Sequence, residues 1–419
     1  MQEKKGRVNG VAILDGAMGT LLEHWGVDLD KAGPMWASSV LLSNPNLVQR
    51  AHEAYIKAGC DVLLTCTYQM SEEGCTASGT AMSDLVDCAI KVARLAIPLP
   101  NKKVNSEVNN LWNDSLTGAS HVFAPLFSSL EAQSERSLLL AGSLGPYGSA
   151  IPGGHEYRGD YEVCDSIIDT FHSKRLLAFV GQLGEKAYLK VDFLLMETLP
   201  RLDEAIKILS WMQQQKEFQN KILATAPVCF SFVSAPIESF FREDGDDKAL
   251  IEWWELHERL SHLPDGNTFG AALTALQKCQ APGLAGIGCN CATPLEVSLM
   301  ASAMLKKKRS DKESTLALLL YPNSGELFEN GQWCQTNVML KDTEVETGKE
   351  EEKMDSLQKL QRKLAIGDGD VCTSLQFVLQ LLHQRDEAED WLVRVILYGG
   401  CCRSTPEDTM ALNRLCSAY

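Results

Sequence analysis

Two adjacent cysteines at the end of the last apolar run, RVILYGGCC, carry the strongest chemical signal in the sequence. In a regular strand the side chains of Cys401 and Cys402 would point to opposite faces, so both can serve one centre only if the backbone leaves strand geometry there. Gly399 and Gly400 make that departure easy. With one further cysteine, the pair would supply three thiolates, the ligand set of a zinc site that keeps one position open for a substrate.

A third cysteine is available about a hundred residues upstream, in the segment GIGCNC. Cys289 and Cys291 both lie there, and on a strand two residues this far apart share a face. A metal-free interpretation also fits, because a buried cysteine pair or a disulfide between Cys401 and Cys402 requires no ion. The position of both segments at the ends of apolar runs favours metal, since catalytic groups gather at strand ends in barrel folds.

A zinc ion held by three thiolates is electron-rich, which suits it to holding a further thiol rather than to hydrolysis. A coordinated thiol loses its proton, whereas a free thiol with a pKa of about 8.5 is mostly protonated at neutral pH. When a thiolate attacks a sulfonium methyl group, two opposite charges cancel, and a dry pocket assists that step. The centre therefore predicts methyl transfer to a thiol.

The composition excludes several classes of protein. The 419 residues are 45% hydrophobic and 22% charged, as in a globular chain, and the net charge of −16 argues against a nucleic-acid partner. No apolar stretch is long enough to span a membrane, and Asp15 interrupts the first apolar run where a signal peptide would need it unbroken. We therefore expect a cytoplasmic protein with small-molecule partners, no membrane and no nucleic acid; the sequence does not indicate its oligomeric state.

Eight short apolar runs alternate with segments of helical period. The runs are VAIL, DVLL, SLLLA, VDFLLM, PVCFSF, LAGIG, TLALLL and VRVIL, and the helical segments include residues 44–59, 83–97, 165–186 and 293–308. This alternation predicts parallel strands with helical crossovers, and eight such units close into an α/β fold, the (β/α)8 TIM barrel. An open doubly wound sheet is the alternative.

We expect a single barrel domain over residues 1–419. Three stretches have the composition of insertions: residues 101–136 are polar and irregular, residues 235–266 are acidic and aromatic, and residues 341–365 carry a run of charge.

Seven motifs in chain order resemble the homocysteine S-methyltransferase family. They are ILDGAMGTLLE, TCTYQMS, AGSLGPYGSAIPGGHEYRGDY, LLMET, GCNCATP, YPNSGE and GGCCRSTPED, and the match runs from about residue 11 to residue 412. The resemblance implies a homocysteine-binding barrel that uses Zn2+ to transfer a methyl group to homocysteine and forms methionine. The third motif is similar to members that use S-methylmethionine or S-adenosylmethionine as the donor rather than betaine.

The resemblance also implies the ligands of the metal. The family's ligands correspond here to Cys291, Cys401 and Cys402, which would activate the substrate thiol through Zn2+. Cys289 stands where the family usually carries an apolar residue, so it is interpreted as a bystander.

Four further residues correspond to substrate-binding positions of the family. Glu197 matches the carboxylate that receives the homocysteine amino group, and Asp15 and Gly16 match the loop that contacts the amino acid. Gln69 stands where betaine users tend to carry tyrosine, and Cys66 replaces a common asparagine. A helix-start carboxylate for Glu197 and a simple turn for Asp15 and Gly16 are the alternatives.

Other interpretations remain open at this point. Trp36, Tyr147, Tyr157 and Trp333 are aromatic residues near the motifs that could pack or could face a sulfonium. The acceptor could be selenocysteine instead of homocysteine. The chain could also be a non-enzymatic zinc or thiol sensor built on the same barrel.

Overall fold

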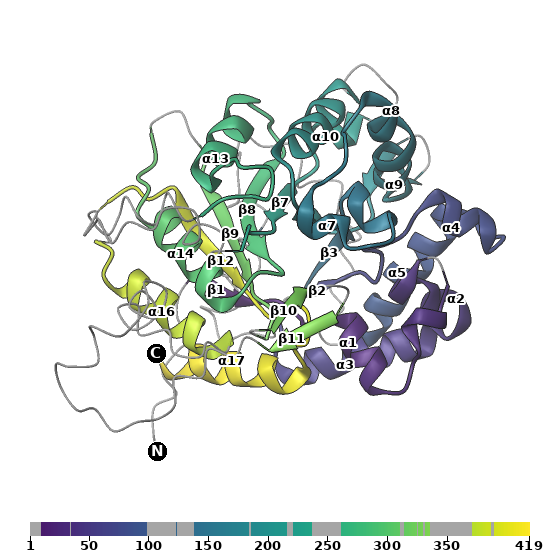
Figure 1. Ribbon diagram of the computed structural model, residues 1–419, viewed down its shortest axis with the longest axis horizontal. Helices are drawn as coiled ribbons and strands as arrows, with labels where there is room; N and C mark the ends of the chain where they lie inside the picture. Colours follow the sequence, from purple (N-terminus) through teal and green to yellow (C-terminus); the bar gives the residue numbers. More distant parts are fainter. Residues whose placement is uncertain are drawn as a thin grey trace.

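The computed structural model describes residues 10–33, 35–98, 123, 138–183, 186–215, 221–236, 261–310, 314–324, 326–329, 332–335, 371–386 and 389–419. Eight parallel strands form its central sheet (Figure 1). They are β1 (Val11–Ile13), β2 (Val62–Leu64), β3 (Leu139–Leu144), β6 (Phe193–Leu199), β7 (Val228–Phe232), β8 (Leu284–Asn290), β9 (Leu316–Tyr321) and β12 (Val393–Tyr398). Each corresponds to one of the eight predicted apolar runs.

The sheet closes on itself in chain order. Parallel pairing runs from β2 through β3, β6, β7, β8 and β9 to β12, and β12 pairs with β1. Between β1 and β2, Leu14 forms a parallel bridge with Val62, and the Asp61 amide donates to the Ile13 carbonyl at 2.7 Å. The predicted TIM barrel is therefore confirmed, and the open sheet is excluded.

Helices surround the strands. The α-helices are α1 (Met18–His24), α2 (Val40–Ser43), α3 (Pro45–Ala58), α4 (Glu72–Ala77), α5 (Met82–Ala96), α7 (His155–Arg158), α8 (Asp165–Ile167), α9 (Ser173–Ala178), α10 (Leu202–Gln214), α13 (Phe269–Lys278), α14 (Pro294–Leu305), α16 (Val371–His383) and α17 (Pro406–Ala418). A π-helical turn, Ile168–His172, joins α8 to α9, and short 3-10 turns include Trp36–Ser39 and Tyr147–Ala150. Two antiparallel hairpins, β4 (Val180–Leu183) with β5 (Lys186–Leu189) and β10 (Glu326–Glu329) with β11 (Gln332–Gln335), lie outside the barrel sheet.

Local sequence explains where the principal helices begin and end. Before α3, the Asn44 side chain accepts from the Leu47 amide, and Pro45 occupies the first turn. Gly59 ends this helix in the left-handed conformation, with φ of 98°. Thr293 and Glu296 form a reciprocal capping box at the start of α14.

One predicted helix ends earlier than expected. The helical pattern over residues 165–186 holds only to Ala178, after which Val180–Leu183 pairs with Lys186–Leu189 as a hairpin. Gly181 explains part of the difference, because glycine is a poor helix former and a Cβ there would come within 2.7 Å of the Tyr188 ring.

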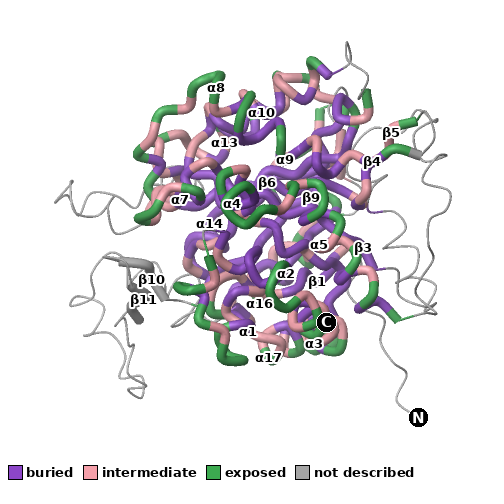
Figure 2. The backbone as a smooth tube through the Cα atoms, turned by 90° about the vertical axis from the view of Figure 1, so that its right-hand side faces the viewer, coloured by how far each residue is buried: buried purple, intermediate pink, exposed green. Residues whose placement is uncertain are grey.

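The apolar core has two parts, one inside the barrel and one between the strands and the helices. Figure 2 shows buried residues concentrated in the interior of the molecule. Strand β6 illustrates the alternation: Phe193 and Leu195 face the barrel interior, while Leu194 and Met196 pack toward the helices. The next inward position on this strand, at its carboxyl end, is Glu197. Polar groups therefore cap the barrel interior at the end where barrel active sites are built.

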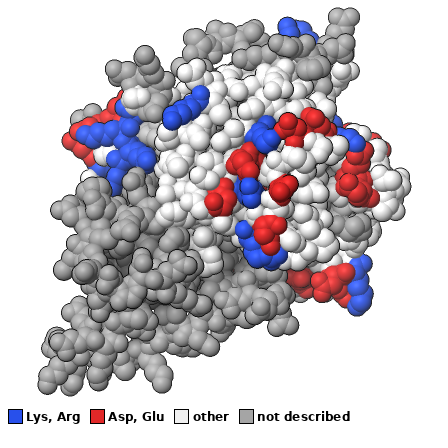
Figure 3. Space-filling model, turned by 45° about the horizontal axis from the view of Figure 1, so that its top comes forward, with Lys and Arg blue, Asp and Glu red and all other residues white. Residues whose placement is uncertain are grey.

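The three predicted insertions lie largely outside the described residues. Residues 341–365 are wholly outside them, only Phe123 of residues 101–136 is inside, and residues 235–266 are described only at 235–236 and 261–266. The insertions therefore stay predictions. On the face drawn in Figure 3, acidic and basic side chains of the described residues form mixed groups. In the same residues, no helix combines the length and the apolar composition that crossing a membrane requires.

Candidate metal centre

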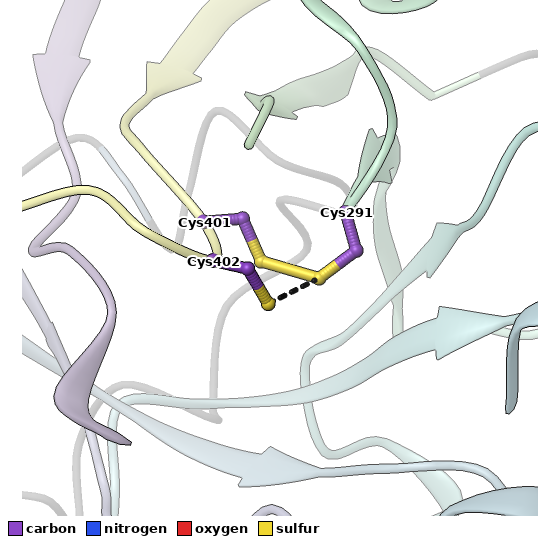
Figure 4. A group of neighbouring side chains, drawn as sticks. All are labelled: Cys291, Cys401 and Cys402. Carbon is purple, nitrogen blue, oxygen red and sulfur yellow. Dashed lines mark hydrogen bonds between the residues drawn. A yellow bond between two sulfur atoms is a disulfide. The ribbon is translucent and has the colours of Figure 1, made fainter. Parts of the chain in front are cut away.

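The structure brings the three predicted cysteine ligands together at the carboxyl end of the barrel (Figure 4). The Sγ atoms of Cys291, Cys401 and Cys402 lie within 4.8 Å of one another, and no other group of three potential metal ligands occurs in the described residues. The Sγ atoms of Cys291 and Cys402 are 3.6 Å apart. Cys291 and Cys401 are joined as a disulfide with a Cα separation of 5.5 Å, so the disulfide does not link the two adjacent cysteines.

The backbone leaves strand geometry before the paired cysteines, as the sequence predicts. Strand β12 ends at Tyr398, and Cys401 and Cys402 follow in a turn. The two glycines contribute differently from the expectation, because neither has a positive φ. A Cβ on Gly399 would come within 2.7 Å of the Leu14 Cβ, and one on Gly400 within 2.5 Å of the Ser404 side chain. Glycine is required there for close approach.

The loop after β9 connects the two cysteine segments, which belong to the strands on either side of it. The Cys401 amide donates to the Pro322 carbonyl at 2.6 Å, and the Ser324 amide donates to the Cys402 carbonyl at 3.1 Å. The Cys291 amide donates to the Tyr321 carbonyl at 3.3 Å. These bonds hold the ends of β8 and β12 in register across β9.

Cys289 does not share a face with Cys291. Cys289 is fully buried in strand β8 and packs with the cluster between the strands and the helices. Cys291 follows the strand with φ of 49°, a left-handed conformation that turns its side chain to the barrel mouth. The expectation that two residues of separation would align these thiols is therefore wrong, because the strand ends between them.

The cysteine set fits a Zn2+ ion when all three thiols are reduced. Zinc binds cysteine sulfur at about 2.3 Å in tetrahedral geometry, which separates two sulfur ligands by roughly 3.8 Å. The 3.6 Å between Cys291 and Cys402 is close to that separation. Burial raises the pKa of the Cys402 thiol to about 11, so a cation is needed to keep it ionised at neutral pH.

Two predicted substrate-binding carboxylates lie beside the cysteines. Asp15 and Glu197 are 4% and 6% exposed. Burial, with the nearby charge of Glu197, raises the pKa of Asp15, although its Oδ2 accepts from the Leu64 amide at 2.9 Å. Burial also raises the pKa of Glu197 to about 7. Among the described residues, no cation contributes to the pKa of either carboxylate, so a positively charged group beside the pair would be favoured electrostatically.

Hydrogen bonds fix the Glu197 carboxylate. The Ser143 hydroxyl donates to Oε1, and the Tyr321 hydroxyl donates to Oε2 at 3.1 Å. Gly16, next to Asp15, has no room for a side chain, because a Cβ would come within 2.7 Å of the Tyr55 ring. The predicted positions 15 and 197 therefore lie close enough to interact electrostatically, and Gly16 packs against Tyr55 beside them.

A hydrogen-bond network of amide and hydroxyl groups, centred on Asn290, lies beside the cysteines. The Asn290 Oδ1 accepts from the Thr198 amide at 2.9 Å and from the Ser231 hydroxyl at 2.7 Å. Its Nδ2 donates to the Thr198 hydroxyl at 2.7 Å and lies 3.9 Å from the Cys401 Sγ. Thr198 has φ of 60°, a strained conformation that such networks maintain at functional sites.

Gln69 lies in the loop after β2 and connects it to the loop after β3. Its Nε2 donates to the Ser149 carbonyl at 3.3 Å, and its buried Oε1 has no partner among the described residues. A buried guanidinium ties the same two loops: Arg175 donates to the Gly145 carbonyl at 2.7 Å and to the Tyr68 carbonyl at 2.6 Å. Cys66 is buried nearby and donates to the Ala37 carbonyl at 3.4 Å.

The aromatic residues near the motifs differ in what they contact. Trp36 packs against Gly19, and Tyr147 packs edge-on against Tyr161 and Phe171. Tyr157 instead reaches the centre, with its hydroxyl 3.9 Å from the Cys402 Sγ. The side chain of Trp333 lies outside the described residues.

The sequence reasoning missed the polar layer around the centre. Ser143, Ser231, Asn290 and Tyr321 were not singled out, although each is the last inward position of a strand. The signal for three of them was present in the sequence, because each of the three stands two residues after an inward-facing position of the same strand. Counting in twos from the inward positions would have found Ser143, Ser231 and Tyr321. Asn290 follows an irregularity in β8, where Val228 pairs with Leu284 and Cys229 pairs with Gly286, so the count fails there.

Comparisons with known proteins agree with this architecture. A family model described as "Homocysteine S-methyltransferase" matches residues 12–416. "Homocysteine S-methyltransferase 1" of Arabidopsis thaliana is 26% identical over 414 residues, covering 97% of this chain and 94% of that protein. "Homocysteine S-methyltransferase YbgG" of Bacillus subtilis is 28% identical over 331 residues, which cover 77% of this chain and 82% of that protein. The metallated crystal form of the homocysteine methyltransferase MmuM from Escherichia coli aligns with a TM-score of 0.57 and 23% identity, over 97% of this chain and 96% of that one, which supports the fold.

Proposed function

The chain belongs to the homocysteine S-methyltransferase family, and on that premise we propose that it transfers a methyl group from S-methylmethionine or S-adenosylmethionine to homocysteine, with Zn2+ as cofactor. The observation that carries the proposal is the meeting of three cysteine sulfurs with two buried carboxylates at one end of the barrel. The first set suits a thiol-activating metal, and the second suits the ammonium group of an amino acid.

Cys291, Cys401 and Cys402 would hold the ion. Zn2+ bound there would lower the pKa of the acceptor thiol, so that the thiolate is available at neutral pH. The chain keeps these side chains in position through the bonds of the β9 loop and through Asn290. Binding requires all three cysteines to be reduced.

Glu197 and Asp15 would bind the homocysteine ammonium group. A charge-assisted bond from an ammonium to a carboxylate is about twice as strong as a neutral hydrogen bond. Binding would also restore the ionised form of Glu197, whose pKa burial raises to about 7. Ser143 and Tyr321 would orient this carboxylate by donating to its two oxygens.

In the reaction, an electron pair of the homocysteine thiolate forms a new bond to the methyl carbon of the sulfonium donor. The bond from that carbon to the donor sulfur breaks, and its electron pair stays on the donor sulfur. The products are methionine and a neutral thioether, which is a second methionine from S-methylmethionine or S-adenosylhomocysteine from S-adenosylmethionine. The chain contributes alignment and the exclusion of water, which favours a step in which opposite charges cancel.

The test is methionine formation by the reduced, zinc-loaded protein with homocysteine and each of the two sulfonium donors in parallel. We expect turnover that depends on zinc and on homocysteine. Stoichiometric zinc without turnover on either donor would contradict the proposal and would favour a sensor. Competition between homocysteine and selenocysteine in the same assay decides the preferred acceptor.

A further inference from the structure

Glu156 is a buried carboxylate that the proposed reaction has not yet used. It lies on α7 and is 9% exposed. Within the described ranges its carboxylate forms no ion pair, and it accepts a hydrogen bond from its own backbone amide. The two cationic neighbours in the same helix are engaged elsewhere, since His155 Nδ1 lies 2.6 Å from Asp160 Oδ1 and Arg158 Nε donates to Asp160 Oδ2 at 2.9 Å.

Helix α7 is held rigidly over the barrel mouth. A Cβ at Gly148 would come within 2.7 Å of the Glu156 amide nitrogen, so the preceding 3-10 turn packs directly on the helix. Arg201, before α10, donates to the Gly159 carbonyl at 2.9 Å just after the helix ends. The position of Glu156 is therefore fixed by the backbone on both sides.

Glu156 lies next to the metal centre in space. Tyr157, the next residue, places its hydroxyl 3.9 Å from the Cys402 Sγ. Burial raises the pKa of Tyr68, and the negative charge of Glu156 is the next largest cause; the same charge also contributes to the raised pKa of Cys402. The Glu156 carboxylate therefore lies close enough to Tyr68, Tyr157 and Cys402 to act on each of them electrostatically.

A buried carboxylate without a counter-ion is costly. Burial raises the pKa of Glu156 to about 7, although the hydrogen bond from its own backbone amide and the charges of His155 and Arg158 act in the opposite direction. Buried charges in folded proteins are normally paired, and unpaired ones in a cleft mark candidate binding sites. A positively charged ligand beside Glu156 would supply the missing partner.

We propose that Glu156 attracts the sulfonium centre of the methyl donor and is the residue that makes the site prefer a cationic donor over its neutral thioether product. This inference rests on the proposed function. Because the methyl carbon must lie in line between donor and acceptor sulfurs, the donor sulfur has to sit within a few ångströms of the acceptor sulfur at the cysteine centre. The charge that falls beside Cys402 is therefore that of the sulfonium.

The role of Glu156 has a kinetic signature. The donor loses its positive charge as the methyl group leaves, so the attraction to Glu156 is stronger in the ground state than in the transition state. Such an interaction lowers the KM for the donor without raising kcat. It also helps the neutral product to depart, because the product has no charge to hold it.

The test compares Glu156→Gln with the wild type, in reduced, zinc-loaded, full-length protein. We expect the KM for the sulfonium donor to rise about tenfold, with kcat unchanged or higher and with zinc content and the KM for homocysteine unchanged. Glu156→Asp should restore part of the donor affinity. Glu162→Gln, which changes an exposed carboxylate in the same loop, should match the wild type.

A binding measurement keeps this inference separate from the catalytic proposal. The ratio of the dissociation constants of S-adenosylhomocysteine and S-adenosylmethionine measures the preference for the cation, and it should fall about tenfold in Glu156→Gln even if turnover is absent. A donor KM within twofold of the wild type together with an unchanged ratio would overturn the inference. Wild-type protein that binds sulfonium compounds with the expected preference but does not transfer the methyl group would instead overturn the proposed function alone.

Discussion

Replacing Glu197 by glutamine should stabilise the empty protein at alkaline pH while impairing homocysteine binding. Glu197 is almost fully buried, and burial raises its pKa from an ordinary value of 4.5 to about 7. The folded protein thus binds this proton more tightly than the unfolded chain. Ionising the buried carboxylate therefore lowers the free energy of unfolding. This loss of stability is absent below pH 4.5, grows between pH 4.5 and pH 7, and is complete above pH 7.

The size of this loss of stability follows from the shift in pKa. A displacement from 4.5 to about 7 corresponds to about 3 kcal/mol above pH 7, at 1.36 kcal/mol for each pH unit. At pH 5 less than about 1 kcal/mol of it is present. Glutamine carries no charge, so the stability of Glu197→Gln relative to the wild type should increase by about 2 to 3 kcal/mol between pH 5 and pH 8. Burial raises the pKa of Asp15, and the charge of Glu197 raises it further. Removing that charge therefore also lowers the cost of ionising Asp15, which adds to the stability of Glu197→Gln at pH 8.

The assay is urea unfolding of the reduced, metal-free wild type and Glu197→Gln at pH 5 and pH 8, with Glu73→Gln as an exposed control. The reasoning would be refuted if the difference in free energy of unfolding between the two proteins were the same at pH 5 and pH 8. It would also be refuted if the wild type gained stability relative to Glu197→Gln at pH 8. In the zinc-loaded enzyme the same substitution should raise the KM for homocysteine by roughly 10- to 100-fold, since a hydrogen bond to a charged group contributes about 1.5–3 kcal/mol. Unchanged homocysteine binding would remove Glu197 from the acceptor pocket.

Three further experiments, with four substitutions, test the site. Cys402→Ala should lose zinc and methyl transfer together, whereas Cys289→Ala should retain both, as measured by metal analysis and turnover; zinc loss in both variants would contradict the assignment of ligands. Arg175→Met removes the guanidinium that donates hydrogen bonds to two loop carbonyls. The kcat/KM for the donor should therefore fall at least tenfold while zinc is retained. Unchanged kinetics would exclude this positioning role. Gly399→Ala places a Cβ within 2.7 Å of the Leu14 side chain and should destabilise the fold by about 1–3 kcal/mol in urea unfolding, and an unchanged midpoint would show that the loop adapts.

The barrel could be predicted because its strands are buried on both faces. Parallel strands of this kind are nearly continuous apolar runs, and all eight runs became barrel strands. The helix predicted over residues 165–186 shows the limit of such patterns. Its residues Val180–Leu183 pair with Lys186–Leu189, and helical periodicity does not reveal such a pairing between two strands.

The cysteine centre was predictable only in part. The sequence shows two strand-end cysteine segments, and the barrel brings them together across β9. Which cysteine of GIGCNC points to the centre depends on where β8 ends, and the positive φ of Cys291 cannot be read from its side chain. Asn290 was missed for a similar reason, because a register irregularity between β7 and β8 precedes it.

The most direct measurement of the central claim is zinc-edge X-ray absorption of the reduced, zinc-loaded protein, with and without homocysteine. Three sulfur ligands at about 2.3 Å should be present without homocysteine, and a fourth should appear when it is added. Fewer than three sulfur ligands, or a sulfur count that homocysteine does not change, would contradict a thiol-activating centre formed by Cys291, Cys401 and Cys402.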